Sequence, residues 1–422
     1  MTAIGLDDTD SRTLGMCTTY LATLVAEAIE AAGGTVERLL LVRLNPAVEH
    51  KTRGNAALAI HTDLPAGVAF DVARDELDRW AIADDDRTSP GLVVAPGSPD
   101  TVSTAVEAFA RDAVRDFHDV SDAVELASES GFLTEGWYGG RGRIGALAAI
   151  GAWAAFDEWT YEHISYREFH RCGTPRDVDV DSVFEAADDG YPVAWDTVDH
   201  DEGEAVCVPN APGPILYGIR GDDPDVVREV ADAIESEPVD RSATFLTNQG
   251  SDAHLRDGTL ATLRDGRAYR VTGTVASPPE TRPGGHVFFD LEADDATAQM
   301  AAFEPTKRFR DRVRSLRVGD HLTVCGEVSD GTLKLEKFAV RDLVQTEPTT
   351  PTCPDCGRTM KSAGRNQGYR CRDCGTDAPG KVEQSVDRTL ERGWYEVPPC
   401  ARRHIAKPLV RGGFDAPTHP ER

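Results

Sequence analysis

Residues 353–374 read Cys-Pro-Asp-Cys-Gly-Arg-Thr-Met-Lys-Ser-Ala-Gly-Arg-Asn-Gln-Gly-Tyr-Arg-Cys-Arg-Asp-Cys. This stretch alone is enough to predict the fold of the segment that contains it. Two Cys-x-x-Cys pairs separated by fourteen residues are typical of a zinc ribbon. The four ligands are Cys353, Cys356, Cys371 and Cys374. Four thiolates leave no coordination position for water, which indicates structural rather than catalytic Zn²⁺. Gly357 and Gly375 follow the two pairs, where tight turns are expected. We therefore predict a zinc ribbon over residues 350–380.

The rest of the chain has the length and composition of a cytoplasmic multidomain protein. Its 422 residues exceed one ordinary core. It has no apolar run long enough for a membrane span, and its first residues do not resemble a signal peptide. The five cysteines outside the ribbon are an odd number and a poor disulfide framework. No protein partner is indicated.

The charge is unevenly distributed. The net charge is −27, and only 7 of the 45 basic residues are lysine. This balance resembles proteins adapted to high internal salt, in which acidic surfaces maintain solubility. Residues 351–422 nevertheless hold 13 basic and 9 acidic residues. The chain therefore has an acidic body and a basic appendage, and a basic appendage suits RNA.

Five short strands upstream of the ribbon predict an OB-fold β-barrel over residues 266–346. The expected strands are 269–275, 287–291, 298–301, 321–328 and 333–340. A basic helical piece, 305–316, interrupts them after the third strand. This pattern matches a fold that often binds oligonucleotides, although a purely structural barrel is the alternative.

The first 126 residues predict an α/β domain. Strands are expected at 3–6, 39–44 and 56–62, with helices at 17–32 and 101–117. Residues 127–262 predict a ferredoxin-like α+β domain. There a helix at 146–155 precedes strands at 161–169 and 215–219, a helix from Asp223 and a strand at 242–246. The border between these two domains is not fixed by the sequence.

An acidic turn follows the first strand. Asp7, Asp8 and Asp10 could hold Mg²⁺ against nucleotide phosphates, although a solvated turn is the alternative in so acidic a chain. Thr18 opens the next helix, where free N–H groups favour a phosphate. Its alternative role is a helix cap. Neighbouring Cys17 has no paired base and is expected to pack.

Two glycine-containing loops are candidate phosphate or RNA contacts. One carries Lys51 and Arg53, and the other carries Arg141 and Arg143 directly before a helix. A flexible domain connector is the alternative for the second loop.

The C-terminal segment, residues 381–422, mixes aromatic and basic side chains, which suits RNA. Its candidate RNA contacts are Arg402, Arg403, His404 and Lys407. The alternative is a tail docked onto the body. A polar run, residues 247–254, ends the second domain and could equally be a strand-capping turn.

The joint occurrence of several motifs resembles the archaeal tRNA(Ile) 2-agmatinylcytidine synthetase family. The motifs are Gly5-Leu-Asp-Asp-Thr-Asp-Ser, Gly15-Met-Cys-Thr-Thr-Tyr, Lys51-Thr-Arg-Gly-Asn-Ala, Arg141-Gly-Arg-Ile-Gly-Ala-Leu-Ala-Ala-Ile-Gly, Thr247-Asn-Gln-Gly-Ser-Asp-Ala-His and Arg403-His-Ile-Ala-Lys-Pro-Leu. The resemblance spans nearly the whole chain and implies a multidomain α+β protein. Its domains would be kinase-like, ferredoxin-like, OB-fold and zinc ribbon.

The resemblance also implies a reaction. Such enzymes join agmatine to C2 of the wobble cytidine in tRNA(Ile) with a CAU anticodon, consuming ATP to AMP and pyrophosphate. By resemblance, Asp7, Asp8 and Asp10 bind Mg²⁺ and ATP phosphates, and Thr18 matches a threonine that becomes phosphorylated. Asp157 and Glu158 are candidate carboxylates for agmatine. Two other functions remain open: a non-catalytic nucleic-acid-binding protein, and a small-molecule kinase with an RNA-binding appendage.

Overall fold

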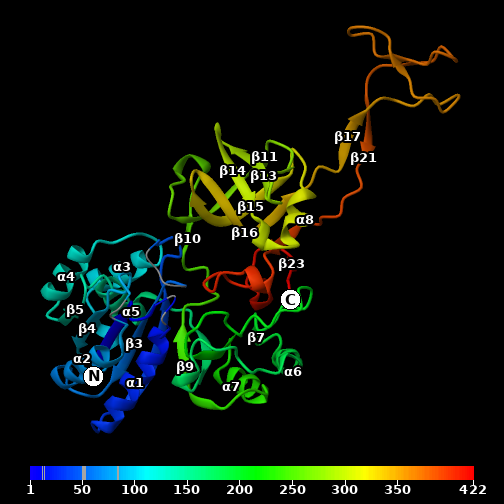
Figure 1. Cartoon of the computed structure of the whole chain (residues 1–422). Coiled ribbons are helices and arrows are strands. Elements are labelled where there is room, and N and C mark those ends of the chain that lie inside the picture. The colour runs from blue at the N-terminus through cyan, green and yellow to red at the C-terminus, as the bar shows by residue number, and fades with distance from the viewer. Residues whose placement is uncertain (12, 14, 50–53, 83–84) are drawn as a thin grey trace.

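The chain folds into a large mixed sheet with helices, a closed barrel and a small projecting ribbon (Figure 1). The computed structural model describes residues 1–422 except 12, 14, 50–53 and 83–84. No helix among the described residues is long and apolar enough to cross a membrane.

One nine-stranded sheet runs through the predicted α/β domain and the predicted α+β domain, in the order β5-β4-β1-β3-β2-β9-β6-β8-β7. The strands are β1 (Thr2–Asp7), β2 (Val36–Arg43), β3 (Ala56–Thr62), β4 (Gly91–Pro96), β5 (Leu133–Gly136), β6 (Thr160–Arg167), β7 (Ala194–Trp195), β8 (Ile215–Gly221) and β9 (Val239–Thr247). The two halves join where β2 pairs in parallel with β9, with Leu40 opposite Leu246. The last strand of the first half, β2, therefore pairs directly with β9 of the second half.

Helices cover both faces of the first half of the sheet. They are α1 (Thr18–Ala31), α2 (Ala66–Trp80), α3 (Thr104–Ala113), α4 (Val120–Glu129) and α5 (Arg143–Ala155). Alternate residues of a strand face opposite sides. Ile4 and Leu58 accordingly pack with α1 and α2, whereas Ala3 and Ala57 pack with α3, α4 and α5. Helix α5, which the sequence placed in the second domain, thus lies on the first half.

The second half of the sheet carries α6 (Val180–Gly190) and α7 (Pro224–Ala233), which share one apolar cluster with β8. Along the chain its elements run β6-α6-β7-β8-α7-β9, and in the sheet its strands lie in the order β9-β6-β8-β7. Asp223 accepts hydrogen bonds from the first turn of α7, as its position before Pro224 predicts. The sequence did not predict α6 or β7.

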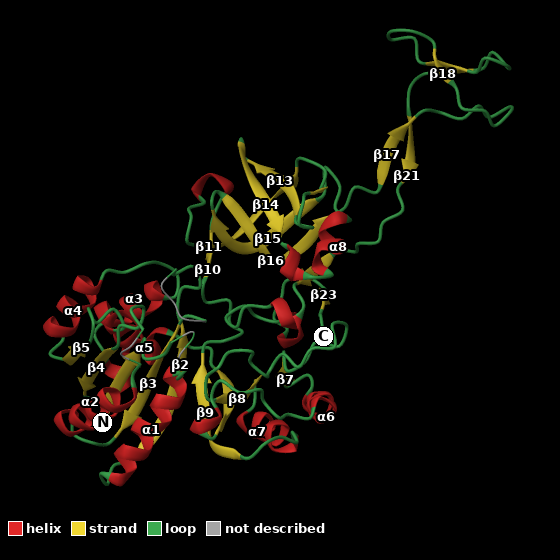
Figure 2. Cartoon of the chain, in the orientation of Figure 1, coloured by secondary structure: helices red, strands yellow, loops and turns green. Residues whose placement is uncertain are grey.

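Five strands close into the predicted barrel (Figure 2). They are β11 (Ala268–Val275), β13 (Val287–Ala293), β14 (Ala296–Ala302), β15 (His321–Ser329) and β16 (Thr332–Asp342). Closure follows from the pairing: β11 contacts β13 and β15, and β16 contacts β14 and β15. Helix α8 (Phe309–Arg314) lies within the predicted helical piece, and its Phe309 and Val313 enter the barrel core. Short strands β10 (Leu255–Asp257) and β12 (Glu280–Thr281) extend the barrel sheet.

The ribbon projects away from the barrel on a two-stranded stem (Figure 1). The stem pairs β17 (Thr346–Thr349) with β21 (Val382–Ser385). Beyond it, β18 (Lys361–Ser362), β19 (Tyr369–Arg370) and β20 (Asp377–Ala378) form a three-stranded sheet. Its apolar cluster holds only Cys353, Met360 and Cys371, with Tyr369 and Ala378 packed against them.

The C-terminal segment returns to the body and docks between the barrel and the second half of the sheet (Figure 1). Strand β22 (Gly393–Glu396) adds to β16, and β23 (Thr418–His419) adds to β22. Ile405, Ala406 and Leu409 are buried. The segment is thus docked onto the body, which was the alternative interpretation, and its contacts with RNA stay a prediction.

A buried histidine predicts acid sensitivity of the first half of the sheet. His61 on β3 is fully buried, and neither ring nitrogen has a hydrogen-bond partner among the described residues. Burial and the Arg38 charge lower the pKa of His61 to about 4. Because the folded pKa lies below that of the unfolded chain, stability is fully present above about pH 6.5 and falls as the pH drops to about 4.

His61→Leu is therefore expected to flatten the dependence of the thermal midpoint on pH between these values. The contribution removed is about 3 kcal/mol. Calorimetry across this pH range measures it. The exposed His170 provides a matched control, since His170→Leu should leave the pH profile as it is. Equal slopes for His61→Leu and the unchanged protein would contradict the prediction.

Candidate active site

A cavity of about 510 Å³ opens where β1 ends. Residues of both halves of the sheet and of the C-terminal segment line it. Asp8, Thr18 and Arg141 come from the first half, Glu162 and Arg220 from the second, and His404 from the C-terminal segment. The C-terminal segment therefore completes a wall that the sheet alone leaves open.

The acidic turn lies on one side of this cavity. Asp7 is the last residue of β1, Asp8 takes a left-handed backbone φ of 58°, and Asp10 is buried. Burial, reinforced by the Asp8 charge, raises the pKa of Asp7 well above its usual value. Burial likewise raises the pKa of Asp8 to about 6, although Arg141 opposes the shift. Three crowded, partly desolvated carboxylates favour the binding of a cation.

Arg141 closes the same side of the cavity. Its Nη2 atom donates to Asp8 Oδ2 at 2.6 Å and to the Arg87 carbonyl at 2.5 Å. Arg143 behaves differently, because its guanidinium donates to the carbonyls of Gly139 and Gly140 and does not line the cavity. The structure therefore brings Arg141 to the acidic turn and uses Arg143 to brace the glycine-rich loop.

Glycines allow α5 to approach the acidic turn closely. A Cβ atom on Gly145 would lie 2.0 Å from Asp7 Oδ2, and one on Gly142 would lie 2.5 Å from the Asp7 carbonyl oxygen. These distances are shorter than any ordinary contact, so no larger residue fits without displacing Asp7. The first turn of α5 therefore lies against Asp7, which explains the glycine-rich motif better than a flexible connector does.

Thr18 begins α1 and lines the cavity. The N-cap residue is Cys17, whose side chain makes no capping hydrogen bond. Thr18 is therefore not the cap, and its Oγ1 accepts a hydrogen bond from Thr9 Oγ1 at 3.2 Å. The first-turn N–H groups of α1 are available to an anion in the cavity. Cys17 Sγ lies 3.1 Å from Thr19 Oγ1.

The opposite wall carries a row of alternating charges that the sequence analysis did not identify. Arg43 on β2 lies 3.7 Å from Glu162 on β6. Glu162 also accepts from Gln249 at 2.5 Å. Arg220 on β8 lies 3.7 Å from Asp196, which also pairs with Arg402 of the C-terminal segment. In the sheet β9 lies between β2 and β6, and β6 pairs with β8, so the row runs across this wall of the cavity.

His404 completes this wall beside two guanidinium groups. It is open to the cavity, but the surrounding protein and the charges of Arg43 and Arg220 lower the pKa of its imidazole well below the usual value. His404 is therefore neutral at pH 7. Its neighbour Arg402 is buried between Asp196 and Glu396, at 2.8 Å from the Glu396 carboxylate.

The other predicted contacts lie elsewhere. Asp157 and Glu158 do not line the cavity, and Glu158 instead pairs with Lys407 at 3.3 Å and Arg411 at 3.0 Å. Arg403 pairs with Glu327 and Glu336 of the barrel. The predicted phosphate contacts Lys51 and Arg53 lie outside the described residues.

The four predicted zinc ligands converge. The Sγ atoms of Cys353, Cys356, Cys371 and Cys374 all lie within 4.8 Å of one another, which fits a tetrahedral thiolate site. Gly357 and Gly375 adopt the left-handed backbone with φ of 70° and 73°, as the knuckle turns require. Among the described residues these cysteines are the only such ligand group, and the three aspartates do not form one.

Comparison with known proteins identifies the family. Three family models match the chain: the TiaS TCKD domain over residues 3–136, the TiaS FLD domain over 140–254, and the TiaS C-terminal zinc ribbon domain over 350–390. The tRNA(Ile) 2-agmatinylcytidine synthetase TiaS of Haloquadratum walsbyi is 60% identical and covers 100% of both chains. That of Methanosarcina mazei is 46% identical over 97% of both chains.

Solved structures agree with this relationship. The crystal structure of a complex of TiaS with its isoleucine tRNA and ATP has a TM-score of 0.90 and 39% identity, covering 100% of this chain and 99% of the other. A complex of TiaS with the same tRNA, AMPCPP and agmatine has a TM-score of 0.87 and 36% identity, with the same coverage. The chain therefore belongs to the TiaS family of tRNA(Ile) 2-agmatinylcytidine synthetases.

Proposed function

We propose that this protein is an ATP-dependent ligase that joins agmatine to C2 of the wobble cytidine of tRNA(Ile) with a CAU anticodon, releasing AMP and pyrophosphate. The observation that carries this proposal is the cavity itself. It holds the acidic turn, Thr18 and Arg141 on one side and a charged wall on the other. A relative with the same fold has been solved with isoleucine tRNA, an ATP analogue and agmatine.

The domains follow from the same proposal. Residues 1–126 form a kinase-like domain, 127–262 a ferredoxin-like domain and 266–346 an OB-fold, except that β5 and α5, within 127–262, complete the first half of the sheet. Residues 350–380 form the zinc ribbon, and 381–422 the C-terminal segment. The strand order β9-β6-β8-β7 with α6 and α7 supports the ferredoxin-like assignment. The closed five-stranded barrel supports the OB-fold.

ATP phosphates bind at the acidic turn in this proposal. Mg²⁺ is usually held by one or two carboxylates and the substrate phosphates, so Asp7, Asp8 and Asp10 do not all need to touch it. When bound, Mg²⁺ neutralises phosphate charge. Arg141 contributes a second positive charge beside Asp8, and the proposal gives Thr18, which begins α1, the role of phosphoryl acceptor.

The chemistry explains why phosphate and RNA share one cavity. The C2 oxygen of cytosine is a poor leaving group, and its bonding to a phosphorus of ATP makes displacement by an amine feasible. One of the two products, AMP or pyrophosphate, leaves ATP when this bond forms, and the other leaves C2 together with the oxygen when the amine displaces it. Cations around the phosphate stabilise the charge that develops. The target base must also leave its stack to reach the cavity.

Agmatine carries an amine and a guanidinium, so its pocket needs a carboxylate. Glu162 is the carboxylate we propose, because it lines the cavity between Arg43 and Arg220. Asp157 and Glu158, predicted from the sequence, lie outside the cavity lining, and this position does not support a role in binding agmatine.

Transfer of labelled agmatine to tRNA tests the proposal. Purified protein, ATP, Mg²⁺, labelled agmatine and tRNA(Ile) with a CAU anticodon are incubated at high salt, and label in RNA, AMP and ADP are measured. Label at the wobble position is expected with AMP formation. Thr18→Ala and Asp8→Asn are each expected to lower the rate by about 100-fold or more.

Asp71→Asn, on the exposed surface of α2, is the matched control and should keep the full rate. Binding of tRNA with neither AMP formation nor label in the RNA would indicate a nucleic-acid-binding protein. ADP formation that does not need tRNA would indicate a small-molecule kinase.

A further inference from the structure

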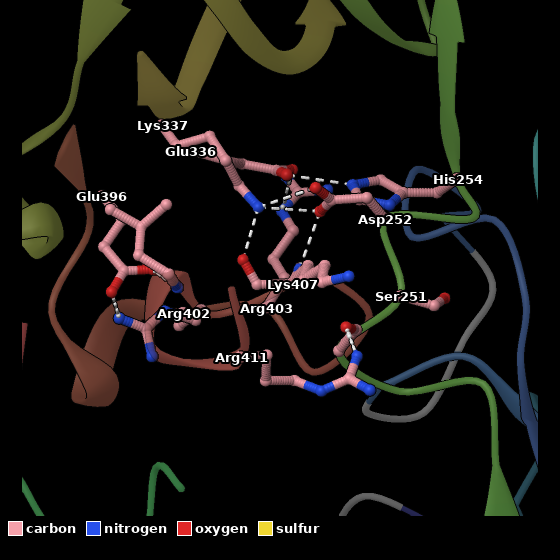
Figure 3. A network of polar contacts seen from close by, with 12 residues as sticks. Ser251, Asp252, His254, Glu336, Lys337, Glu396, Arg402, Arg403, Lys407 and Arg411 are labelled. Atoms are coloured by element: carbon pink, nitrogen blue, oxygen red, sulfur yellow. Dashed lines mark hydrogen bonds and ion pairs between the residues drawn. The ribbon is translucent and has the colours of Figure 1, made fainter. Parts of the chain in front are cut away.

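A buried lysine joins the barrel to the segments that build the cavity (Figure 3). Lys337 is one of seven lysines in the chain. It lies on β16 and is 1% exposed. Its Nζ atom donates to both carboxylate oxygens of Asp252, at 2.8 and 2.9 Å, and to the carbonyl of Lys407, at 2.6 Å. The Phe414 ring lies 5.5 Å from the same nitrogen. All three donor directions of the ammonium are therefore used.

Asp252 connects this lysine to two other segments. Its backbone has a left-handed φ of 61°. Its carboxylate also accepts from the Lys407 amide at 2.7 Å, and its own amide donates to the Ile405 carbonyl at 3.0 Å. The Gly250 amide donates to the His404 carbonyl at 2.8 Å. The loop after β9 and residues 404–407 are thus bonded as a pair, and Lys337 fastens the pair to the barrel.

A second charged contact fastens the same two segments beside the first. His254 Nε2 lies 2.9 Å from Glu336 Oε2, and Arg403 Nε lies 3.3 Å from Glu336 Oε1. Arg403 also pairs with Glu327 on β15. Burial opposes ionisation of Glu336, but its contacts with His254 and Arg403 outweigh burial and lower its pKa to about 2. Glu336 and Lys337 are consecutive on β16, where its pairing with β15 is irregular, and neither residue belongs to the apolar core of the barrel.

The loop after β9 and the segment 404–407 both adjoin residues of the cavity wall. Asn248 accepts from the Arg43 amide at 2.7 Å, and Gln249 donates to Glu162. Both residues lie a few positions before Asp252. On the other segment, His404 lines the cavity next to the residues that the barrel holds. A shift of the barrel that carries Asp252 and residues 404–407 with it therefore moves His404 and the Gln249 side chain that donates to Glu162.

We propose that Lys337 is a positioning residue for the ligation reaction, and this inference rests on the proposed function. Lys337 holds the barrel, the loop after β9 and the C-terminal segment at fixed distances, so that the bound tRNA presents its base to a correctly formed wall. Burying a lysine and an aspartate together stabilises a protein little compared with apolar packing. Its benefit here is geometric specificity.

Lys337→Met tests the proposal, because it keeps most of the side-chain length and removes the charge. We expect kcat for agmatine transfer to fall about 10- to 100-fold, with KM for ATP within about twofold. Backbone amides in peptides covering residues 248–255 and 403–409 should exchange with deuterium faster. Lys334 is a half-buried lysine on the same strand. Lys334→Met is therefore the matched control and should change neither kcat nor deuterium exchange.

A barrel-destabilising control separates positioning from folding. Val324→Ala leaves a cavity in the barrel core but removes none of the Lys337 hydrogen bonds, which go to Asp252 and Lys407. At a temperature where both variants remain folded, it should keep kcat and normal exchange in the two peptides. If Val324→Ala loses as much kcat as Lys337→Met at equal thermal midpoint, the role is structural and the proposal is overturned. Unchanged kcat in Lys337→Met overturns it as well.

Asp252→Asn provides a milder second variant should Lys337→Met not fold. Asparagine tolerates the left-handed backbone and keeps an acceptor for the Lys407 amide, but it removes the charge facing Lys337. The same fall in kcat with faster exchange in both peptides is expected, and unchanged values overturn the proposal. Failure of the unchanged protein to label tRNA would instead count against the proposed function.

Discussion

Gly145→Ala is expected to lower the rate of agmatine transfer about 100-fold while the protein stays folded. The added Cβ would lie 2.0 Å from Asp7 Oδ2 and 3.1 Å from the Ala57 side chain. Because the Asp7 carboxylate is the end of a short side chain, it can rotate away and the helix need not move. The cost therefore falls on the geometry of the acidic turn, and kcat measures it.

Gly151→Ala on the same helix is the matched control. Its Cβ would clash with the Val106 carbonyl at 2.5 Å and with Ala110, both on α3, far along α5 from the acidic turn. This variant should lower the thermal midpoint more than Gly145→Ala does and lower kcat less. The opposite order would show that α5 acts only as a structural element and that its first turn does not position Asp7.

Removing the zinc is expected to unfold residues 350–380 and leave the rest of the chain folded. The apolar cluster of the ribbon contains only three buried residues, too few for an independent apolar core. Zinc binding in such small domains supplies about 10–16 kcal/mol of folding free energy in peptides. Chelation or Cys371→Ser should therefore abolish slow amide exchange across the ribbon and weaken tRNA binding, whereas ATP binding at the cavity persists.

Cys172→Ser, outside the ribbon, is the control, and metal content is measured alongside tRNA affinity at one fixed salt concentration. Equal tRNA affinity with and without zinc would contradict an RNA-binding role for the ribbon. A ribbon that keeps its slow-exchanging amides without metal would contradict the assignment of Zn²⁺ as its structural cofactor.

Elements with a strong local pattern were predictable from the sequence. The ribbon ligands are set by spacing, and the barrel strands by alternation of apolar residues over short runs. Helix α1 was predicted within one or two residues because its buried face is made of large side chains. Helix α2 was not predicted, because its buried residues are Ala69, Ala73 and Leu77, and alanines give almost no apolar contrast. The same holds for α4, which buries two alanines.

The candidate site was only half predictable for a different reason. Asp7, Asp8, Asp10, Thr18 and Arg141 belong to short motifs, and the structure brings them to one cavity. Arg43, Glu162 and Arg220 are single residues on separate strands, and they meet only because β2 pairs with β9 and β9 with β6. Such long-range pairing leaves no local pattern. Glu162 lies only four residues after the predicted Glu158, but no local sequence pattern distinguishes the two as candidate agmatine ligands.

The docking of residues 399–404 into the cavity wall also determines the point during synthesis at which the protein can first be active. During synthesis the acidic turn leaves the ribosome early, and the roughly 400 residues that separate it from this wall take about 20–80 s to follow. Throughout that time a nascent chain that has already folded its sheet has no complete cavity. An aborted chain that ends within the ribbon would carry the acidic turn without His404 or Arg402, and could not modify a tRNA with an unfinished wall.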